Sequence, residues 1–323
     1  MPASSPGGEL AERARAGDRR ALARLLSAVE GRTPDGEAGL RALFPYAGRA
    51  HLVGVTGAPG TGKSTLVAAL IGGLRAAGRS VAVVAVDPSS SITGGAILGD
   101  RVRMQQHADD RDVFVRSMAS RGHAGGLASA TVAAAGVLDA VGFDVVLLET
   151  VGAGQSEIEV AGAADTTVVV EAPGMGDEIQ ALKAGLLEVA DLIVVNKGDL
   201  PGAQRAAAQL RAMVSAAAPP ARPGQPTPKR PEVLVATATT GQGVAELMAA
   251  IDRHRARLVA SDDTGAGLAR AEAHLQAALA DRLHDRLQGA DERAAREEAV
   301  RLIAEHRLDP YAAADRLLAS LGE

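Results

Sequence analysis

Apolar residues recur with two different spacings along this chain, and the change falls near residue 51. Over residues 8–30, leucines and alanines recur at roughly helical spacing, and Asp18 is placed to cap a second helix after Gly17. From His51 onward, short runs rich in Val, Ile and Leu alternate with helical stretches. Since nearly continuous apolar strands are typical of parallel sheets covered by helices on both faces, we predict an α/β fold with a mostly parallel central sheet. The expected strands cover residues 51–57, 80–87, 112–117, 143–150, 166–172, 191–197 and 232–238.

The strand pattern stops near residue 262. Residues 271–287 and the two stretches that follow are charged and amphipathic, which predicts helices. We therefore predict three parts: a short N-terminal helical extension over residues 1–46, the α/β domain over residues 47–262, and a C-terminal helical arm over residues 263–323.

Two interpretations of the arm stay open. It is either a solvated helical tail or an arm that binds a partner or a second copy of the chain. Both faces of the predicted sheet already have helices to cover them, and isolated helices are marginal in water. Because two-fold homodimers are the commonest oligomers, the simplest partner is the same arm of a second chain. The apolar positions of the arm are Leu275, Ala278, Leu283, Leu287, Leu302, Leu308, Leu317 and Leu318.

Composition removes several classes of function. The 323 residues carry a net charge of −5 and only 2% aromatic residues, which argues against a general nucleic-acid binder. The absence of cysteine excludes disulfides, cysteine-ligated zinc, iron–sulfur clusters and a thiol nucleophile. No apolar segment resembles a signal peptide or a membrane span, so we expect a cytoplasmic protein.

A glycine-rich phosphate-binding motif follows the first predicted strand and precedes a helical stretch. The sequence GAPGTGKS fits the pattern G-x-x-x-x-G-K-[ST]. Its backbone amides would turn toward phosphate oxygens at the positive end of the helix dipole. Lys63 would reach the β- and γ-phosphates, and the Ser64 hydroxyl would bind Mg²⁺. The candidate residues are Gly57, Ala58, Pro59, Gly60, Thr61, Gly62, Lys63, Ser64 and Thr65.

A second motif, Asn196-Lys197-Gly198-Asp199, indicates which base is bound. Four letters alone are a weak match, equally well explained by a polar turn, but here they follow a late strand in a chain with a phosphate loop. The Asp199 carboxylate can accept hydrogen bonds from guanine N1–H and its 2-amino group. Lys197 can lie over the base, and Asn196 can tie this loop to the phosphate loop. A further loop with Thr237, Ala238 and Thr239 stands where a backbone contact to guanine O6 is expected, so we predict GTP.

Three carboxylates after predicted strands are candidate magnesium ligands beside Ser64. They are Asp87, Asp100 and Glu149. The alternative, that Asp87 and Asp100 only cap following helices or turns, stays open. The stretch after Glu149 reads as a switch whose Gly152 amide would sense the γ-phosphate. The usual D-x-x-G-Q pattern is absent, so Gln155 cannot simply be assigned to position water.

Five motifs together resemble one family, the GTPases associated with methylmalonyl-CoA mutase, within the P-loop metallochaperone-like GTPases. They are GAPGTGKST (57–65), VDPSSS and TGGAILGDRVRM (within 86–104), ETVGAGQSE (149–157), APGMGDEIQALKAG (172–185) and NKGD (196–199). The resemblance implies a P-loop GTPase domain that serves a separate adenosylcobalamin-dependent acyl-CoA mutase, gating cofactor loading and protecting that enzyme from inactivation. It also implies homodimers formed through the C-terminal arm, bound Mg²⁺, and no cobalamin on this chain.

The same resemblance implies a third switch that couples nucleotide state to the mutase, with Asp177, Gln180 and Lys183 as candidates. Lys63, Asp87 and Lys183 are the expected catalytic residues. Two other functions stay open: a nickel or cobalt metallochaperone GTPase, and a kinase acting on an amino-acid transport system. The first would favour a cysteine or histidine cluster, and the second would leave Asn196–Asp199 without a role.

Overall fold

The computed structural model describes residues 5–88, 109–120, 126–150, 164–174, 189–217, 230–260, 264–287 and 289–320. The chain divides into two compact units, Met1–Thr264 and Gly265–Glu323. The first unit contains the sheet and the second contains helices only, among the residues described.

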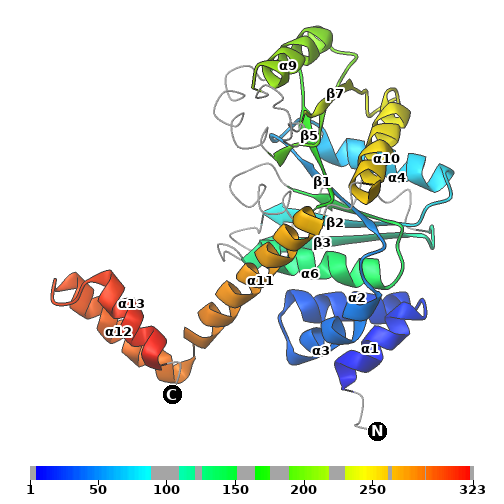
Figure 1. The fold of residues 1–323 in the computed structure, drawn as a ribbon. Coiled ribbons are helices and arrows are strands. Elements are labelled where there is room, and N and C mark those ends of the chain that lie inside the picture. The colour runs from blue at the N-terminus through cyan, green and yellow to red at the C-terminus, as the bar shows by residue number, and fades with distance from the viewer. Residues whose placement is uncertain are drawn as a thin grey trace. The chain divides into compact units, whose positions relative to one another are not determined.

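The first unit is built on a seven-stranded sheet in which every strand pair is parallel (Figure 1). The strand order is β3-β2-β4-β1-β5-β6-β7. All seven predicted strands are present, which confirms the α/β prediction. Their bounds are β1 His51–Thr56, β2 Val81–Pro88, β3 Val113–Ser120, β4 Val145–Glu149, β5 Thr166–Glu171, β6 Leu192–Val195 and β7 Glu232–Val235.

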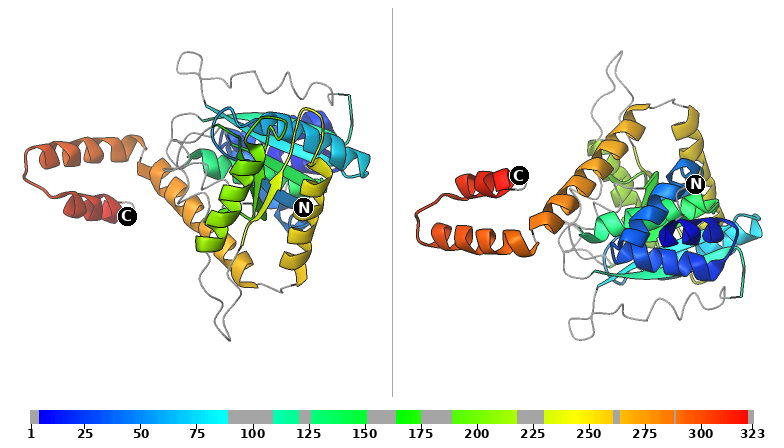
Figure 2. Two further views of the ribbon diagram at one scale, coloured as in Figure 1. Left: turned by 90° about the horizontal axis from the view of Figure 1, so that it is seen from above. Right: turned by 90° about the horizontal axis from the view of Figure 1, so that it is seen from below.

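Helices pack on both faces of the sheet because its inner strands are apolar on both sides (Figure 2). On one face, α4 (Lys63–Ala76) and α10 (Val244–Ala260) share a core with every second strand residue, such as Val168 and Val170. The opposite face is covered by α6 (Gly126–Ala140) and by α9 (Ala203–Ala217), which packs against Val169 of the same strand.

The N-terminal extension is a group of three helices, α1 (Pro6–Arg15), α2 (Arg19–Glu30) and α3 (Pro34–Leu43). The predicted cap is confirmed: Asp18 Oδ1 accepts hydrogen bonds from the amides of Arg20 (2.9 Å) and Ala21 (3.0 Å). Leu22, Leu25 and Leu26 of α2 are buried in the cluster that contains α6. The extension therefore shares a core with one face of the sheet.

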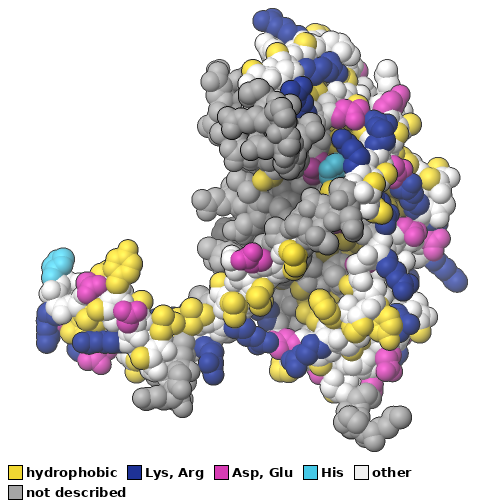
Figure 3. Space-filling model, viewed as in Figure 1, with side chains coloured by type: hydrophobic (Ala, Val, Ile, Leu, Met, Phe, Trp, Pro, Cys, Tyr) yellow, Lys and Arg dark blue, Asp and Glu magenta, His cyan; other side chains and the backbone are white. Residues whose placement is uncertain are grey.

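The second unit consists of α11 (Thr264–Leu287), α12 (Ala290–Ala304) and α13 (Pro310–Ser320), which confirms the predicted helical character. Ala299 and Ala313 are buried, whereas several apolar residues along α11 are exposed, including Leu268, Leu275 and Leu279. Figure 3 shows hydrophobic side chains at the surface along α11. No helix among the described residues is both long enough and apolar enough to cross a membrane.

Candidate nucleotide-binding site

The phosphate loop lies against the neighbouring strand, and its glycines make that approach sterically feasible. Gly57 has φ +139°, and a Cβ there would stand 2.1 Å from the carbonyl oxygen of Val170 in β5. Gly62 has φ +90°, and a Cβ there would meet Asn196 Nδ2 at 2.5 Å. A side chain at either position would displace the loop or its neighbour.

Helix α4 begins directly after this loop, at Lys63, and Gly62 provides no side-chain cap. The amides of its first turn are therefore left to other acceptors, the condition under which helix N-termini bind phosphate. The Lys63 side chain is buried, and its Nζ donates to the carbonyl oxygens of Gly57 (2.7 Å) and Ala58 (3.1 Å). Thr61 Oγ1 donates to the Ala58 oxygen at 2.9 Å. A cation thus sits within the loop that the sequence assigns to phosphate.

Asn196 connects the phosphate loop to both candidate base loops. Its Nδ2 donates to the carbonyl oxygens of Thr61 (2.9 Å) and Gly62 (3.4 Å), and its Oδ1 accepts from the Ala238 amide (3.1 Å). The side chain is buried. These contacts bring together three segments that are far apart in the sequence, and they hold the loops at a fixed separation.

Lys197 has a left-handed backbone, with φ +56°, which is uncommon for a residue other than glycine. Its Nζ donates to the Gly60 oxygen at 2.7 Å, so the aliphatic stem spans from one loop to the other. Gly198 follows in a confined position, since a Cβ there would stand 2.8 Å from a Val235 methyl. The loop geometry depends on this sequence of backbone conformations.

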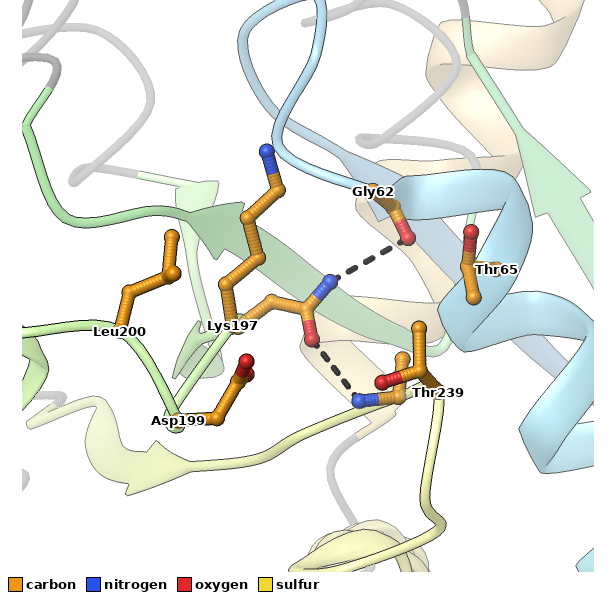
Figure 4. A pocket seen from close by; sticks show the side chains of 8 residues that line it. Gly62, Thr65, Lys197, Asp199, Leu200 and Thr239 are labelled. Carbon is orange, nitrogen blue, oxygen red and sulfur yellow. Dashed lines mark hydrogen bonds between the residues drawn. The ribbon is translucent and has the colours of Figure 1, made fainter.

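The two base loops and the start of α4 line an open cavity of about 240 Å³. Figure 4 shows Lys197 and Asp199 on one side of this cavity and Gly62 and Thr65 on the other. The Asp199 carboxylate can therefore act as an acceptor in a space of small-molecule size. The lining residues are Gly62, Thr65, Asn196, Lys197, Asp199, Leu200, Ala238 and Thr239.

Thr237 shapes the third loop from within. Thr237 is buried, and its amide donates to the backbone carbonyl oxygen of Gln242 at 2.8 Å. The backbone carbonyl oxygen of Thr237 accepts hydrogen bonds from the amides of Thr240 and Gly241. The Ala238 amide, in the loop predicted to contact guanine O6, donates to Asn196 Oδ1. Thr239 lines the cavity, as does Leu200, which the sequence reasoning missed. The position of Leu200 directly after Asp199 in the sequence could have indicated that Leu200 lies at the site.

Two of the four predicted metal ligands lie together. Ser64 Oγ, in the first turn of α4, donates at 2.5 Å to Oε1 of Glu149, the last residue of β4. Glu149 is buried, and the next residue, Thr150, donates to Thr56 Oγ1 at 3.0 Å. Magnesium prefers oxygen ligands, so the paired hydroxyl and carboxylate fit that ion.

Asp87 belongs to β2, but its side chain lies outside the part that is described. Asp100, Gly152, Asp177, Gln180 and Lys183 also lie outside the described residues, as does Gln155.

The parallel sheet, the phosphate loop after β1 and the linked base loops define a GTPase of the P-loop class. The chain belongs to the family described as methylmalonyl-CoA mutase-associated GTPase MeaB, whose model matches residues 22–292.

Individual relatives agree with this family. A Pyrococcus abyssi protein classed as a GTPase is 42% identical and spans 96% of this chain and 95% of the relative. The Escherichia coli GTPase ArgK is 46% identical over 59% of each chain. A crystal structure of a LAO/AO transport system kinase matches all of both chains, with a TM-score of 0.70 and 28% identity.

Proposed function

We propose that this GTPase is the chaperone of an adenosylcobalamin-dependent methylmalonyl-CoA mutase, or of a related acyl-CoA mutase, and acts in the cytoplasm. GTP hydrolysis to GDP and phosphate gates loading of the cobalamin cofactor and protects the mutase from inactivation. The mutase is a separate protein that carries the cobalamin. Guanine binding is best supported by the hydrogen bonds of Asn196 to Thr61 and Ala238. These bonds hold the Asp199 loop at a fixed distance from the phosphate loop.

In this proposal each loop has one task. Asp199 accepts from guanine N1–H and the 2-amino group, and Lys197 covers the face of the base. Lys63 and backbone N–H groups of the phosphate loop, residues 57–65 apart from Pro59, hold the phosphates. Ser64, Glu149, Asp87 and Asp100 hold Mg²⁺, which when bound neutralises charge on the β- and γ-phosphate oxygens.

The response to the nucleotide is assigned to segments outside the described residues. Gly152 senses the γ-phosphate, while Asp177 and Gln180 transmit that state to the mutase. Lys183 supplies positive charge to the transition state when the mutase is bound. Without the D-x-x-G-Q pattern, turnover of the isolated chain is expected to be slow. The arm over residues 263–323 forms the homodimer.

The decisive experiment measures GTP hydrolysis by the purified chain with and without cobalamin-free mutase from the same host. We expect the mutase to raise turnover and to co-purify with the chain. Asp199→Ala should remove the response by weakening GTP binding, and Gln242→Ala, an exposed amide on the third loop, serves as the matched control. Absence of both stimulation and co-purification would reject the mutase role while leaving the GTPase assignment intact.

A kinase function is the second candidate, because the structural relative is named a LAO/AO transport system kinase. The two functions differ in where the γ-phosphate goes. With GTP that is radiolabelled on its γ-phosphate, the chaperone releases labelled inorganic phosphate. A kinase instead transfers the label to an acceptor molecule. A nickel or cobalt metallochaperone remains the other alternative, and it predicts stoichiometric metal binding by a chain that has no cysteine.

A further inference from the structure

The C-terminal half of α10 is attached to the sheet by polar contacts instead of apolar burial. Its last buried residue is Ile251, and none of residues 252–260 is buried. Four consecutive residues, 252–255, contact four different parts of the first unit. We call these residues and their partners the polar seat. It lies at the edge of the sheet where β1, β5 and β6 begin, opposite the nucleotide loops.

Three of the four contacts involve arginine. Asp252 accepts two hydrogen bonds from Arg79, each 2.7 Å long. Arg253 donates to Glu232 at the start of β7, at 2.9 Å. Arg255 donates to the carbonyl oxygen of Arg49, just before β1, at 2.6 Å. None of these three contacts involves an imidazole, the side chain whose ordinary titration lies nearest neutral pH.

The fourth contact, through His254, belongs to a chain of hydrogen bonds that enters the protein interior. His254 Nε2 lies 3.1 Å from Asp191 Oδ1, and His254 Nδ1 lies 2.8 Å from Thr166 Oγ1. Thr166 Oγ1 in turn lies 2.7 Å from His51 Nε2. Asp191 is itself held by the Thr167 amide, which donates to Oδ2 at 2.7 Å. His51 and Thr166 are buried.

Donor and acceptor rules allow a single arrangement of protons in this chain when both imidazoles are neutral. An ionised Asp191 can only accept, so His254 carries its proton on Nε2. His254 Nδ1 must then accept from the Thr166 hydroxyl, and Thr166 Oγ1 must accept from His51 Nε2–H. The remaining nitrogen, His51 Nδ1, is buried without a hydrogen-bond partner among the residues described.

Asp191 would favour a positive charge on His254, but an added proton finds no free hydrogen-bond acceptor among the described residues at either remaining nitrogen, His51 Nδ1 or His254 Nδ1. A proton on His51 Nδ1 would be a buried donor without a described acceptor. A proton on His254 Nδ1 would face the Thr166 hydroxyl, which could turn only toward a His51 nitrogen that already carries hydrogen. Burial is the largest cause of the lowered pKa of His51. Positive charge on Arg255 and Arg79 lowers it further, a proton on His254 has the same effect, and Asp252 partly offsets them, so that this pKa lies at about 4. Asp144, Asp165 and Asp191 precede β4, β5 and β6 at the same end of the sheet.

We propose that the polar seat is pH-sensitive: neutral histidines hold the C-terminal turns of α10 on the sheet, and a proton taken up by the pair releases these turns while the nucleotide site stays intact. This inference does not depend on the proposed function. If release restores an ordinary pKa of 6.5 to His51, the released form gains about 30-fold over the seated form between about pH 7.5 and about pH 5.

Amide hydrogen exchange of the full-length protein tests this proposal, with rates corrected for the intrinsic effect of pH. Between about pH 7.5 and about pH 5, protection of residues 253–260 should fall about 30-fold, whereas α4 keeps its protection and GDP affinity is unchanged. In His51→Gln, whose side-chain amide can still donate to Thr166, the fall should shrink to about threefold or less. His306→Gln changes an exposed histidine of the second unit and should behave as wild type.

Equal loss of protection in α4 and α10, or an unchanged response in His51→Gln, would overturn the proposal. Should His51→Gln not fold, the wild-type protein still provides a test. Long-range ¹H–¹⁵N spectra of histidine-labelled protein should show neutral Nε2–H tautomers for His51 and His254, with His51 still neutral at about pH 5.5. A neutral Nδ1–H form of either histidine, or a charged His51 at that pH, would equally reject it.

Discussion

Asn196→Ala is expected to disconnect the phosphate loop from the base loops. The wild-type side chain is buried and bonds to Thr61, Gly62 and Ala238. The Gly62 oxygen keeps another donor, the amide of Leu66, at 2.9 Å. Truncation therefore removes the observed partners of two groups, the Thr61 carbonyl and the Ala238 amide. Each buried group left unsatisfied costs about 1–3 kcal/mol, so for two groups the free energy of unfolding should fall by about 2–6 kcal/mol.

The same variant should bind GDP about ten- to a hundredfold more weakly, a loss of about 1.4–2.7 kcal/mol, because the loops no longer have a fixed separation. Fluorescence titration with a labelled GDP measures the affinity, and urea unfolding measures the stability. Gln242→Ala removes an exposed amide from the third loop and should change neither quantity. GDP affinity within twofold of wild type in Asn196→Ala would show that the bridge does not organise the site.

Four further outcomes follow from other residues. Asp199→Ala should weaken GDP about ten- to a hundredfold with little effect on ADP, and equal affinities of the intact protein for ADP and GDP would exclude guanine recognition. Lys183→Ala should lower mutase-stimulated turnover but leave GDP affinity unchanged; unaltered stimulation would contradict its role. Truncation after residue 262 should give a folded monomer that binds GDP, whereas light scattering should find the full-length chain dimeric. Arg79 lowers the pKa of Asp252, so this carboxylate stabilises the fold above about pH 4 and loses that effect as the pH falls through its lowered pKa. Asp252→Asn should therefore destabilise the protein in urea at neutral pH and differ less from wild type near pH 3, and an equal difference at both pH values would count against the ion pair.

The strands could be predicted because their residues are apolar on both faces, so each appears as a continuous run between polar segments. The break between α1 and α2 was also predictable, since Gly17, with φ +91°, precedes the capping Asp18. Packing of the N-terminal helices on α6 was not predictable, because leucine spacing defines a helix face but not the surface that covers it.

Some features of the site could also be predicted from the sequence, and others could not. The phosphate loop is a continuous motif, so its position after β1 followed from the sequence alone. The contact between Asn196 and Thr61 spans 135 positions. It was inferred from the role that the Asn196–Asp199 motif has in a chain with a phosphate loop, and not from the spacing of apolar residues. No motif marks the chain from His51 through Thr166 to His254, which arises from the order of strands in the sheet. Such contacts depend on register and helix placement, which local patterns do not specify.

Helix α10 begins at Val244, immediately after the loop that closes the base end of the cavity, and the chain continues from its last residue into the arm. GTP and GDP are identical at the base and differ only at the far end of the triphosphate. Along the chain, α10 is therefore the element that joins the base end of the cavity to the arm. A contact with the base end of the site is the same for both nucleotides, so only groups at the phosphate end can tell GTP from GDP.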